Sequence, residues 1–180
     1  MRCYLSILLF LLLLAPAKAQ PKYEVRAAWV TAVYGLDWPR TKATTPTAIR
    51  RQQEELTDIL DKLKAANFNT ILFQTRTRGD VLYHSSIEPY NSILTGKVDG
   101  DPGYDPLAFA VRECHKRGME CHAWMVTIPL GNKKHVASLG SQSVTKRMKE
   151  ICVPYKREYF LNPGHPATKE YLMKLVREVV

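Results

Sequence analysis

The order of apolar and polar positions along the chain predicts three buried β-strands. The apolar runs at 25–33, 70–75 and 119–126 are short and rich in β-branched or aromatic residues. Mainly apolar segments of this length are typical of buried strands. Each run is followed by a long stretch of turn-forming residues, and we therefore expect the strands to be separated in sequence and joined by helices.

Three stretches show the spacing of amphipathic helices. Thr45-Pro46 and Asp105-Pro106 each supply an N-cap residue followed by proline at the first helical position, and a third helix is expected over 166–180. Apolar residues then recur every three or four positions and form one face of each helix. The predicted apolar faces contain Ile49, Leu56, Ile59, Leu60 and Leu63, then Leu107, Ala110, Val111 and Cys114, then Leu172, Leu175, Val176 and Val179.

The alternation of strand and helix predicts a parallel sheet with right-handed crossovers. A doubly wound dinucleotide fold would place a tight glycine-rich turn after the first strand, whereas this chain has a long loop with Asp37 and Trp38. Long loops after strands favour a (β/α)8 barrel, which needs eight strands and about 250 residues. We therefore expect 20–180 to be the amino-terminal part of such a barrel, about three βα units. A short, complete α/β domain is the less favoured alternative. The segment 127–164 shows little periodicity and is expected to be irregular.

The amino end has the features of a secretory signal peptide. Arg2 precedes an apolar run at 5–14, and Ala17-Lys18-Ala19 provides small residues for cleavage before Gln20. The run is shorter than the roughly 20 residues that span a bilayer. We expect 1–19 to be removed, a secreted or periplasmic mature protein, and no stable membrane insertion afterwards. An uncleaved anchor is the alternative.

Charge and cysteine content narrow the possible partners. Lys and Arg number 26 and Asp and Glu 17, and loss of the signal peptide leaves a net charge of +7. The charges are scattered, which favours a solvated surface over a nucleic-acid site. Cys114, Cys121 and Cys152 remain as thiols, and Cys121-His122 on a strand would point to opposite faces. We expect no metal and no cofactor.

Polar residues near the carboxyl ends of the strands are the candidate ligand-binding groups. Gln74 and Arg76 share one face of the second strand, and His122 and Trp124 share one face of the third. Such a row can hydrogen-bond a hydroxyl-rich ligand, or form an internal network. Trp124 or Trp38 is a candidate stacking platform, whereas Trp29 is also expected as core.

The Asp and Glu residues of the sequence include no evident pair of catalytic carboxylates. Asp37 and Asp80 follow the first two strands, but loop aspartates commonly serve turns. Glycoside hydrolysis needs two carboxylates flanking the scissile bond, and no pair in the sequence fits. Nucleophile-elbow, phosphate-loop and zinc-protease motifs are absent from the sequence.

Four ordered segments, 24–39, 68–90, 94–125 and 160–180, together resemble the glycosyl-hydrolase-like 10 family. The resemblance implies a (β/α)8 glycoside hydrolase acting on polysaccharide, in some members on peptidoglycan glycan strands. It implies catalytic acids beyond Val180 and these substrate-binding residues: Arg26, Trp29, Gln74, Arg76, Asp80, Tyr83, His122, Trp124 and Asn162.

The chain departs from the family pattern at two places. It lacks an Asn-Pro after Trp124 and has Tyr90 where Trp is common. The first departure affects the contacts expected after Trp124. Two alternatives to a hydrolase also remain, namely a non-catalytic carbohydrate-binding homologue that uses Trp124 and Trp38 as platforms, and a binder of anionic polymers through the +7 charge.

Overall fold

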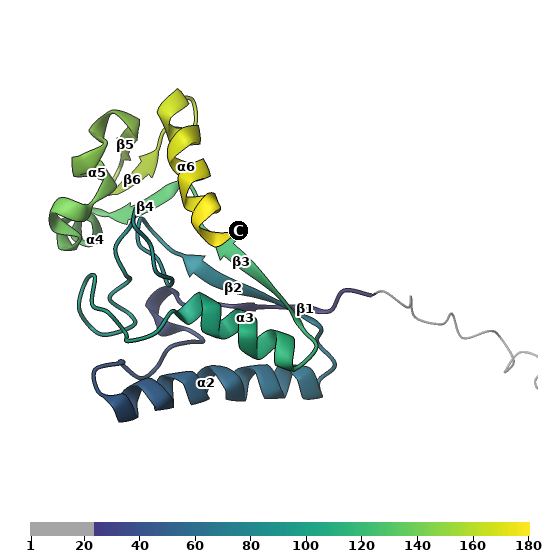
Figure 1. Ribbon diagram of the computed structural model, residues 1–180. Coiled ribbons are helices and arrows are strands. Elements are labelled where there is room, and N and C mark those ends of the chain that lie inside the picture. Colours follow the sequence, from purple (N-terminus) through teal and green to yellow (C-terminus); the bar gives the residue numbers. More distant parts are fainter. Residues whose placement is uncertain (1–23) are drawn as a thin grey trace, which may run out of the picture.

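The computed structural model describes residues 24–180 and contains a three-stranded parallel sheet (Figure 1). Strand β2 (Thr70–Arg76) lies between β1 (Ala27–Val30) and β3 (Glu120–Met125). All three predicted strands are confirmed. A register shift between Gln74 and Arg76 interrupts the pairing of β2 with β3 near their carboxyl ends. The predicted signal peptide, 1–19, lies outside the described residues.

Two helices follow β1 and β2 and begin where the capping residues predict. Helix α2 spans Pro46–Ala65, and Thr45 Oγ1 accepts the Ala48 N–H at 3.2 Å. Helix α3 spans Pro106–Lys116, and Asp105 Oδ1 accepts the Ala108 N–H at 2.9 Å. Each cap satisfies a backbone donor that the first helical turn leaves free.

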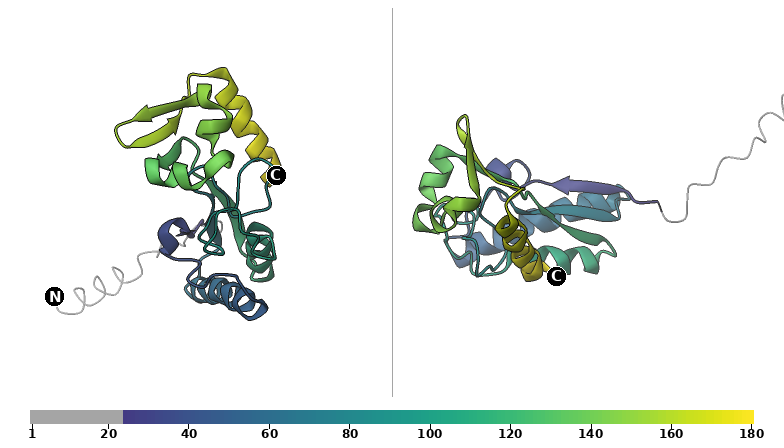
Figure 2. Two further views of the ribbon diagram at one scale, coloured as in Figure 1. Left: turned by 90° about the vertical axis from the view of Figure 1, so that its left-hand side faces the viewer. Right: turned by 90° about the horizontal axis from the view of Figure 1, so that it is seen from above.

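Helices α2, α3 and α6 lie on the same side of the parallel sheet (Figures 1 and 2). The core lies between this side of the sheet and the helices, and includes Val30, Ile71, Phe73, Leu56, Leu60 and Cys114. Among residues 24–180, no helix covers the other side, which we call the open face. Helices on a single side are compatible with part of a glycosyl hydrolase barrel, whereas a doubly wound sheet carries helices on both sides.

The segment 127–164 is ordered, so the prediction of an irregular segment is wrong. Strands β4 (Pro129–Asn132), β6 (Glu158–Leu161) and β5 (Cys152–Tyr155) form an antiparallel sheet in that order. The other elements here are α4 (Lys133–Ser138), α5 (Val144–Arg147) and the single turns η2 (Gly140–Gln142) and η3 (Lys149–Ile151). A further single turn, η1 (Val33–Gly35), follows β1. The strands here have four residues each, too few for a recognisable alternation.

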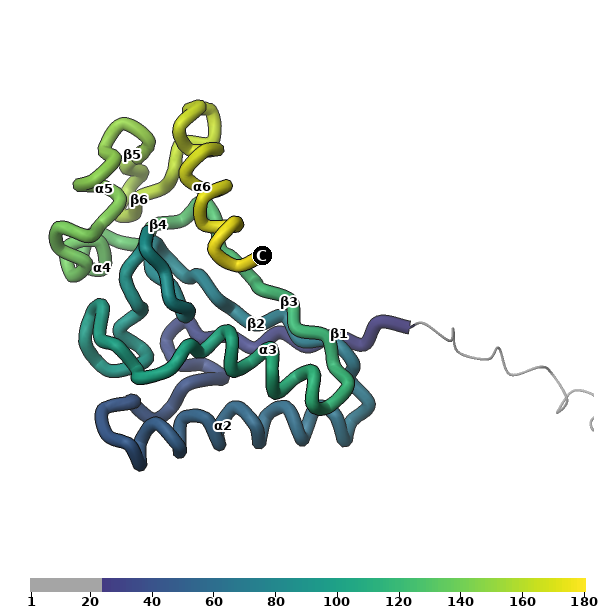
Figure 3. Tube along the Cα trace, in the orientation of Figure 1, coloured from purple at the N-terminus to yellow at the C-terminus, as the bar shows by residue number. Residues whose placement is uncertain are grey.

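Helix α6 (Pro166–Val179) follows β6 and ends beside β3, as the Cα trace shows (Figure 3). Tyr171 and Leu175 are buried against the antiparallel sheet, whereas Val179 packs against the core beneath the parallel sheet. Helix α6 therefore connects the two sheets. No helix within residues 24–180 has the length and apolar composition to cross a membrane.

Candidate functional site

An aromatic pair occupies the open face. Trp29 of β1 and Trp124 of β3 meet edge to face, with ring centroids 4.5 Å apart and planes at 85°. Trp29 is 57% exposed and Trp124 is partly buried. Edge-to-face pairs are favoured by the ring quadrupole, and the contact fixes both rings across the intervening strand. The expectation that Trp29 belongs to the core is wrong.

On the open face, residues that are paired across the three strands lie side by side at one level of the sheet, and the register defines two such levels. Trp29 pairs with Leu72 and Leu72 with His122, so these three form the first level. Gln74 pairs with Trp124 one step closer to the carboxyl ends. His122 is exposed, and its Nε2 lies 3.0 Å from Glu120 Oε2. The structure therefore brings four of the predicted residues together on one face.

Gln74 is buried and holds the loop after β1. Its Oε1 accepts the N–H groups of Ala32 at 2.9 Å and Val33 at 2.8 Å. These donors would otherwise lack partners where β1 ends, and buried backbone groups need them. The side-chain carbonyl oxygen of Gln74 therefore anchors the start of the loop after β1.

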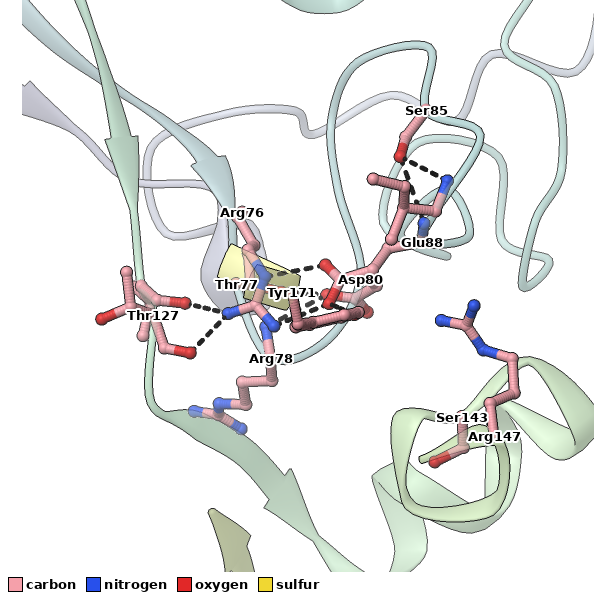
Figure 4. Close-up of polar contacts among 12 residues, drawn as sticks. Arg76, Thr77, Arg78, Asp80, Ser85, Glu88, Thr127, Ser143, Arg147 and Tyr171 are labelled. Atoms are coloured by element: carbon pink, nitrogen blue, oxygen red, sulfur yellow. Dashed lines mark hydrogen bonds and ion pairs between the residues drawn. The ribbon is translucent and has the colours of Figure 1, made fainter. Parts of the chain in front are cut away.

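Arg76 is part of a fully buried network (Figure 4). Its Nε and Nη2 donate to the two carboxylate oxygens of Glu88, each at 2.7 Å, and Nη1 donates to the carbonyls of Val126 and Thr127. The Tyr171 hydroxyl donates to Glu88 Oε1. Arg76 therefore joins β2, the following loop, the end of β3 and α6, and its guanidinium is enclosed by protein.

Electrostatics inside this network favour the charged pair. Burial lowers the pKa of Arg76, but the adjacent Glu88 carboxylate outweighs it, so the pKa is raised. Burial and the negative charge of Glu88 raise the pKa of Tyr171 well above its usual value, so the phenol keeps its proton. The network therefore consists of the Arg76–Glu88 salt bridge and the neutral Tyr171 hydroxyl, which donates a hydrogen bond to Glu88.

The other predicted residues lie away from the aromatic pair. Arg26 is exposed at the amino end of β1, where Nε donates to the Asn67 carbonyl at 2.5 Å and Nη1 to Glu24 at 2.9 Å. Asn162 follows β6, and its Oδ1 accepts the Gly164 N–H at 3.0 Å in the turn before α6. Both residues stabilise turns at these positions.

Asp80 and Tyr83 are buried in the loop after β2. Asp80 Oδ1 accepts the Thr77 hydroxyl and, at 3.2 Å, the Arg78 N–H. Tyr83 donates its hydroxyl to Glu178 of α6 at 3.4 Å, and burial raises its pKa. Both side chains therefore help to order the loop after β2.

Trp38, the second predicted platform, is fully enclosed in the core, so that prediction is wrong. Its Nε1 donates to the Gln52 carbonyl at 2.8 Å, and its ring lies against Phe73. Residues 24–180 contain no cluster of three or more His, Cys, Asp or Glu side chains arranged to hold a metal. Cys114, Cys121 and Cys152 are free thiols.

One further feature, at the carboxyl ends of β1 and β2, was not predictable from the sequence. A cavity of about 350 Å³ is lined there by Tyr34, Lys42, Arg78 and His135, among others. These residues come from three separate loops or short elements. The one indication of a ligand in the sequence was that Lys42, Arg78 and His135 are basic residue types. Scattered basic residues are common on protein surfaces, so this indication was weak.

Comparison with known proteins identifies the family. The model of the Glycosyl hydrolase-like 10 family matches residues 24–180. Glycosyl hydrolase YngK of Bacillus subtilis (strain 168) is 32% identical over 165 residues, covering 91% of this chain and 32% of that protein. Glycosyl hydrolase DigH of Escherichia coli (strain K12) is 35% identical over 179 residues, covering 92% of this chain and 41% of that protein. The chain thus spans about a third to two fifths of the length of these relatives, and it belongs to the Glycosyl hydrolase-like 10 family.

Proposed function

We propose that the protein is a secreted or periplasmic glycoside hydrolase acting on a bacterial or environmental polysaccharide. Peptidoglycan glycan strands are one candidate substrate. Family membership supports the reaction class, and both curated relatives carry the name glycosyl hydrolase. The signal-like sequence at 1–19 supports export.

The observation that carries the proposal is the Trp29–Trp124 pair on the open face. Sugar rings present apolar C–H faces and polar edges, and sites for such ligands combine aromatic side chains with a few polar groups. Gln74 lies at the level of Trp124, and His122 at the level of Trp29. The open face would then be one wall of the substrate cleft.

The same proposal takes the parallel sheet as three strands of a (β/α)8 barrel. In such barrels the site forms at the carboxyl ends of the strands. Asp37, Asp80 and Glu88 at this end each accept internal hydrogen bonds, Asp37 from the Thr31 N–H at 2.8 Å, and we take none of them as the catalytic acid. We therefore place the catalytic acids outside residues 24–180.

Tryptophan fluorescence tests sugar binding directly. The chain has three tryptophans, and Trp38 is buried away from the open face. We expect oligosaccharides to change the emission of the purified chain, and Trp124→Ala or Trp29→Ala to lower the affinity about tenfold or more. Trp38→Phe is the matched control, because it removes an emitter from the core and should leave the affinity unchanged.

Hydrolysis is tested with the protein expressed from its complete gene. Release of reducing ends from a panel of polysaccharides, reduced in Trp124→Ala, is the expected result. Sugar binding without hydrolysis would support the non-catalytic carbohydrate-binding alternative. Absence of any sugar-dependent change in emission or reducing ends would contradict the proposal.

A further inference from the structure

The cavity at the carboxyl ends of β1 and β2 is rich in positive charge. Lys42 comes from the loop after β1, Arg78 from the loop after β2 and His135 from α4, and all three line the cavity. None of its lining residues is an aspartate or glutamate. Its volume, about 350 Å³, is at the lower end of the range for small-ligand sites, roughly 300–1,000 Å³.

Lys42 and Arg78 have hydrogen-bond donors that residues 24–180 do not use. Among residues 24–180, neither Lys42 nor Arg78 forms an ion pair. Lys42 Nζ donates to the Ile93 carbonyl at 2.7 Å, and Arg78 Nη1 donates to the Tyr34 hydroxyl at 2.7 Å. An ammonium and a guanidinium carry more donors than these bonds use. Partial burial lowers the pKa of Lys42, in keeping with a charge that lacks a counter-ion.

Arg78 is held in place from two directions. The Tyr34 ring lies against its guanidinium, with Cζ 4.8 Å from the ring centroid, in addition to the hydroxyl contact. Tyr34 itself has φ of +58°, a conformation that costs a non-glycine residue energy and that clusters at ligand clamps. In Figure 4 the Arg78 side chain extends away from the buried network around Arg76. The guanidinium is therefore preorganised toward the cavity side.

His135 is oriented by the loop beneath it. Its Nε2 lies 3.1 Å from the Arg78 carbonyl and 3.5 Å from Asp80 Oδ2, so Nε2 carries a proton. Nδ1 has no hydrogen-bond partner among the described residues. Gly131 permits this packing, because a Cβ there would lie 2.8 Å from the His135 ring and 3.2 Å from Arg78 Cδ.

The cavity adjoins the open face. Val33 lines the cavity, and its N–H is held by Gln74, which lies at the level of Trp124. A sugar chain stacked on the aromatic pair would continue toward Arg78 and Lys42. Gln74 thus connects the carboxyl end of the open face to the backbone that lines the cavity.

We infer that this cavity is a subsite for an acidic sugar residue, whose carboxylate is bound by Arg78 and Lys42. The inference rests on the proposed function, because it requires that the glycan bound by the aromatic pair carry a negative charge. A planar guanidinium with unused donors matches a carboxylate in two-point geometry. A neutral sugar would leave the partly buried Arg78 guanidinium without a counter-ion.

Paired oligosaccharides that differ only in charge test the inference. Binding to the purified chain is measured by calorimetry for an oligogalacturonate and for the same oligosaccharide after reduction of its carboxyls to alcohols. The disaccharide N-acetylglucosaminyl-N-acetylmuramate and its carboxyl-reduced form make a second arm, which separates a ring carboxylate from an ether-linked one. We expect the acidic member of at least one pair to bind about tenfold or more tightly.

The variants assign that preference to the cavity. Arg78→Gln and Lys42→Gln should each remove most of the preference for the acidic sugar over the neutral one. Arg51→Gln on α2 and Lys169→Gln on α6 remove the same charges from exposed positions and should keep the preference. Arg78→Lys serves as a second variant if Arg78→Gln does not fold by circular dichroism.

The possible outcomes separate the two proposals. Equal binding of acidic and neutral sugars, or an acidic preference unaffected by Arg78 and Lys42 variants, would overturn the subsite and leave the proposed function standing. Failure of every sugar to bind would contradict the proposed function, and the subsite with it.

Discussion

Arg76 and Glu88 form a two-point ion pair in which neither side chain has any exposed surface. The pair lies where β2 ends, and its remaining hydrogen bonds reach the end of β3 and Tyr171 of α6. A buried ion pair contributes little net stability compared with well-packed apolar residues, but loss of one partner leaves an uncompensated charge. Its main effect here is to fix the relative positions of four segments around the carboxyl end of the sheet.

Glu88→Gln should therefore lower the free energy of unfolding by about 3–5 kcal/mol. The neutral amide cannot balance the Arg76 guanidinium, which has no access to water. Urea unfolding followed by circular dichroism measures the change. Tyr171→Phe, which removes one hydrogen bond and keeps both charges, should cost only about 1–2 kcal/mol.

Asp61→Asn is the matched control, because it removes an exposed carboxylate from its ion pair with Arg117. Its unfolding midpoint should remain near that of the unsubstituted chain, since exposed pairs contribute little. Equal unfolding curves for Glu88→Gln and Asp61→Asn would show that the buried pair does not hold these segments.

The helices and the parallel sheet were predictable because each depends on local sequence. Thr45-Pro46 and Asp105-Pro106 mark the helix starts, and strand β2 contains the apolar run Ile71–Phe73. The elements in 127–164 were not predictable in this way. Their strands pair only with each other and have four residues each, so burial there depends on contacts across the segment.

The candidate site was predicted only in part, because strand position tells which way a side chain points but not what it contacts. Trp124 and His122 do lie on the open face. Arg76 points to the same end, yet its partner Glu88 lies twelve residues away in a loop, a relationship no periodicity reveals. His135 joins the cavity through α4, a helix of six residues that the sequence did not predict.

Gln52 of α2 offers a second test of buried polar contacts. Its Nε2 donates to the carbonyls of Thr41 at 2.6 Å and Leu94 at 2.9 Å, and its Oε1 accepts the Tyr104 hydroxyl at 2.6 Å. Gln52→Leu leaves the Thr41 carbonyl and the Tyr104 hydroxyl without partners, whereas the Leu94 carbonyl keeps the Ala43 N–H at 2.8 Å. The variant should cost about 2–4 kcal/mol, since each unsatisfied buried group carries a penalty of about 1–3 kcal/mol. Thermal and urea unfolding measure the loss.

The neighbouring Gln53 provides the control for this variant, because it is only partly buried. Gln53→Leu should change the free energy of unfolding by less than about 0.5 kcal/mol, the usual range for positions away from such networks. A Gln52→Leu variant as stable as Gln53→Leu would mean that Gln52 does not anchor the loops around Thr41 and Leu94.

Gln74 should act through its carbonyl oxygen, which accepts two N–H groups at the end of β1. Gln74→Glu keeps the acceptor and should preserve the loop, whereas Gln74→Met removes it and should cost about 1–3 kcal/mol. Amide hydrogen exchange at Ala32 and Val33 measures the effect locally, with faster exchange expected only in Gln74→Met. Equal protection in both variants would contradict an anchoring role.

Stability should also fall in alkaline solution, because burial raises the pKa values of four tyrosines. The pKa of Tyr90 is raised to about 12, and those of Tyr83, Tyr104 and Tyr171 are raised further. A phenol that ionises near pH 10 in the unfolded chain but keeps its proton when folded favours unfolding as the pH rises. This contribution is fully present below pH 10 and is lost as the pH rises through 12.

Tyrosinate absorbance and circular dichroism, followed together from pH 8 upward, test this dependence. These four residues should ionise above pH 10 and in step with unfolding. Tyr104→Phe should be less stable at neutral pH, because Gln52 loses its hydroxyl donor, yet should lose stability less steeply above pH 10. Complete ionisation of all tyrosines near pH 10 with the dichroism unchanged would show that these phenols are not buried as described, and would remove the hydroxyl of Tyr171 from the Arg76–Glu88 network.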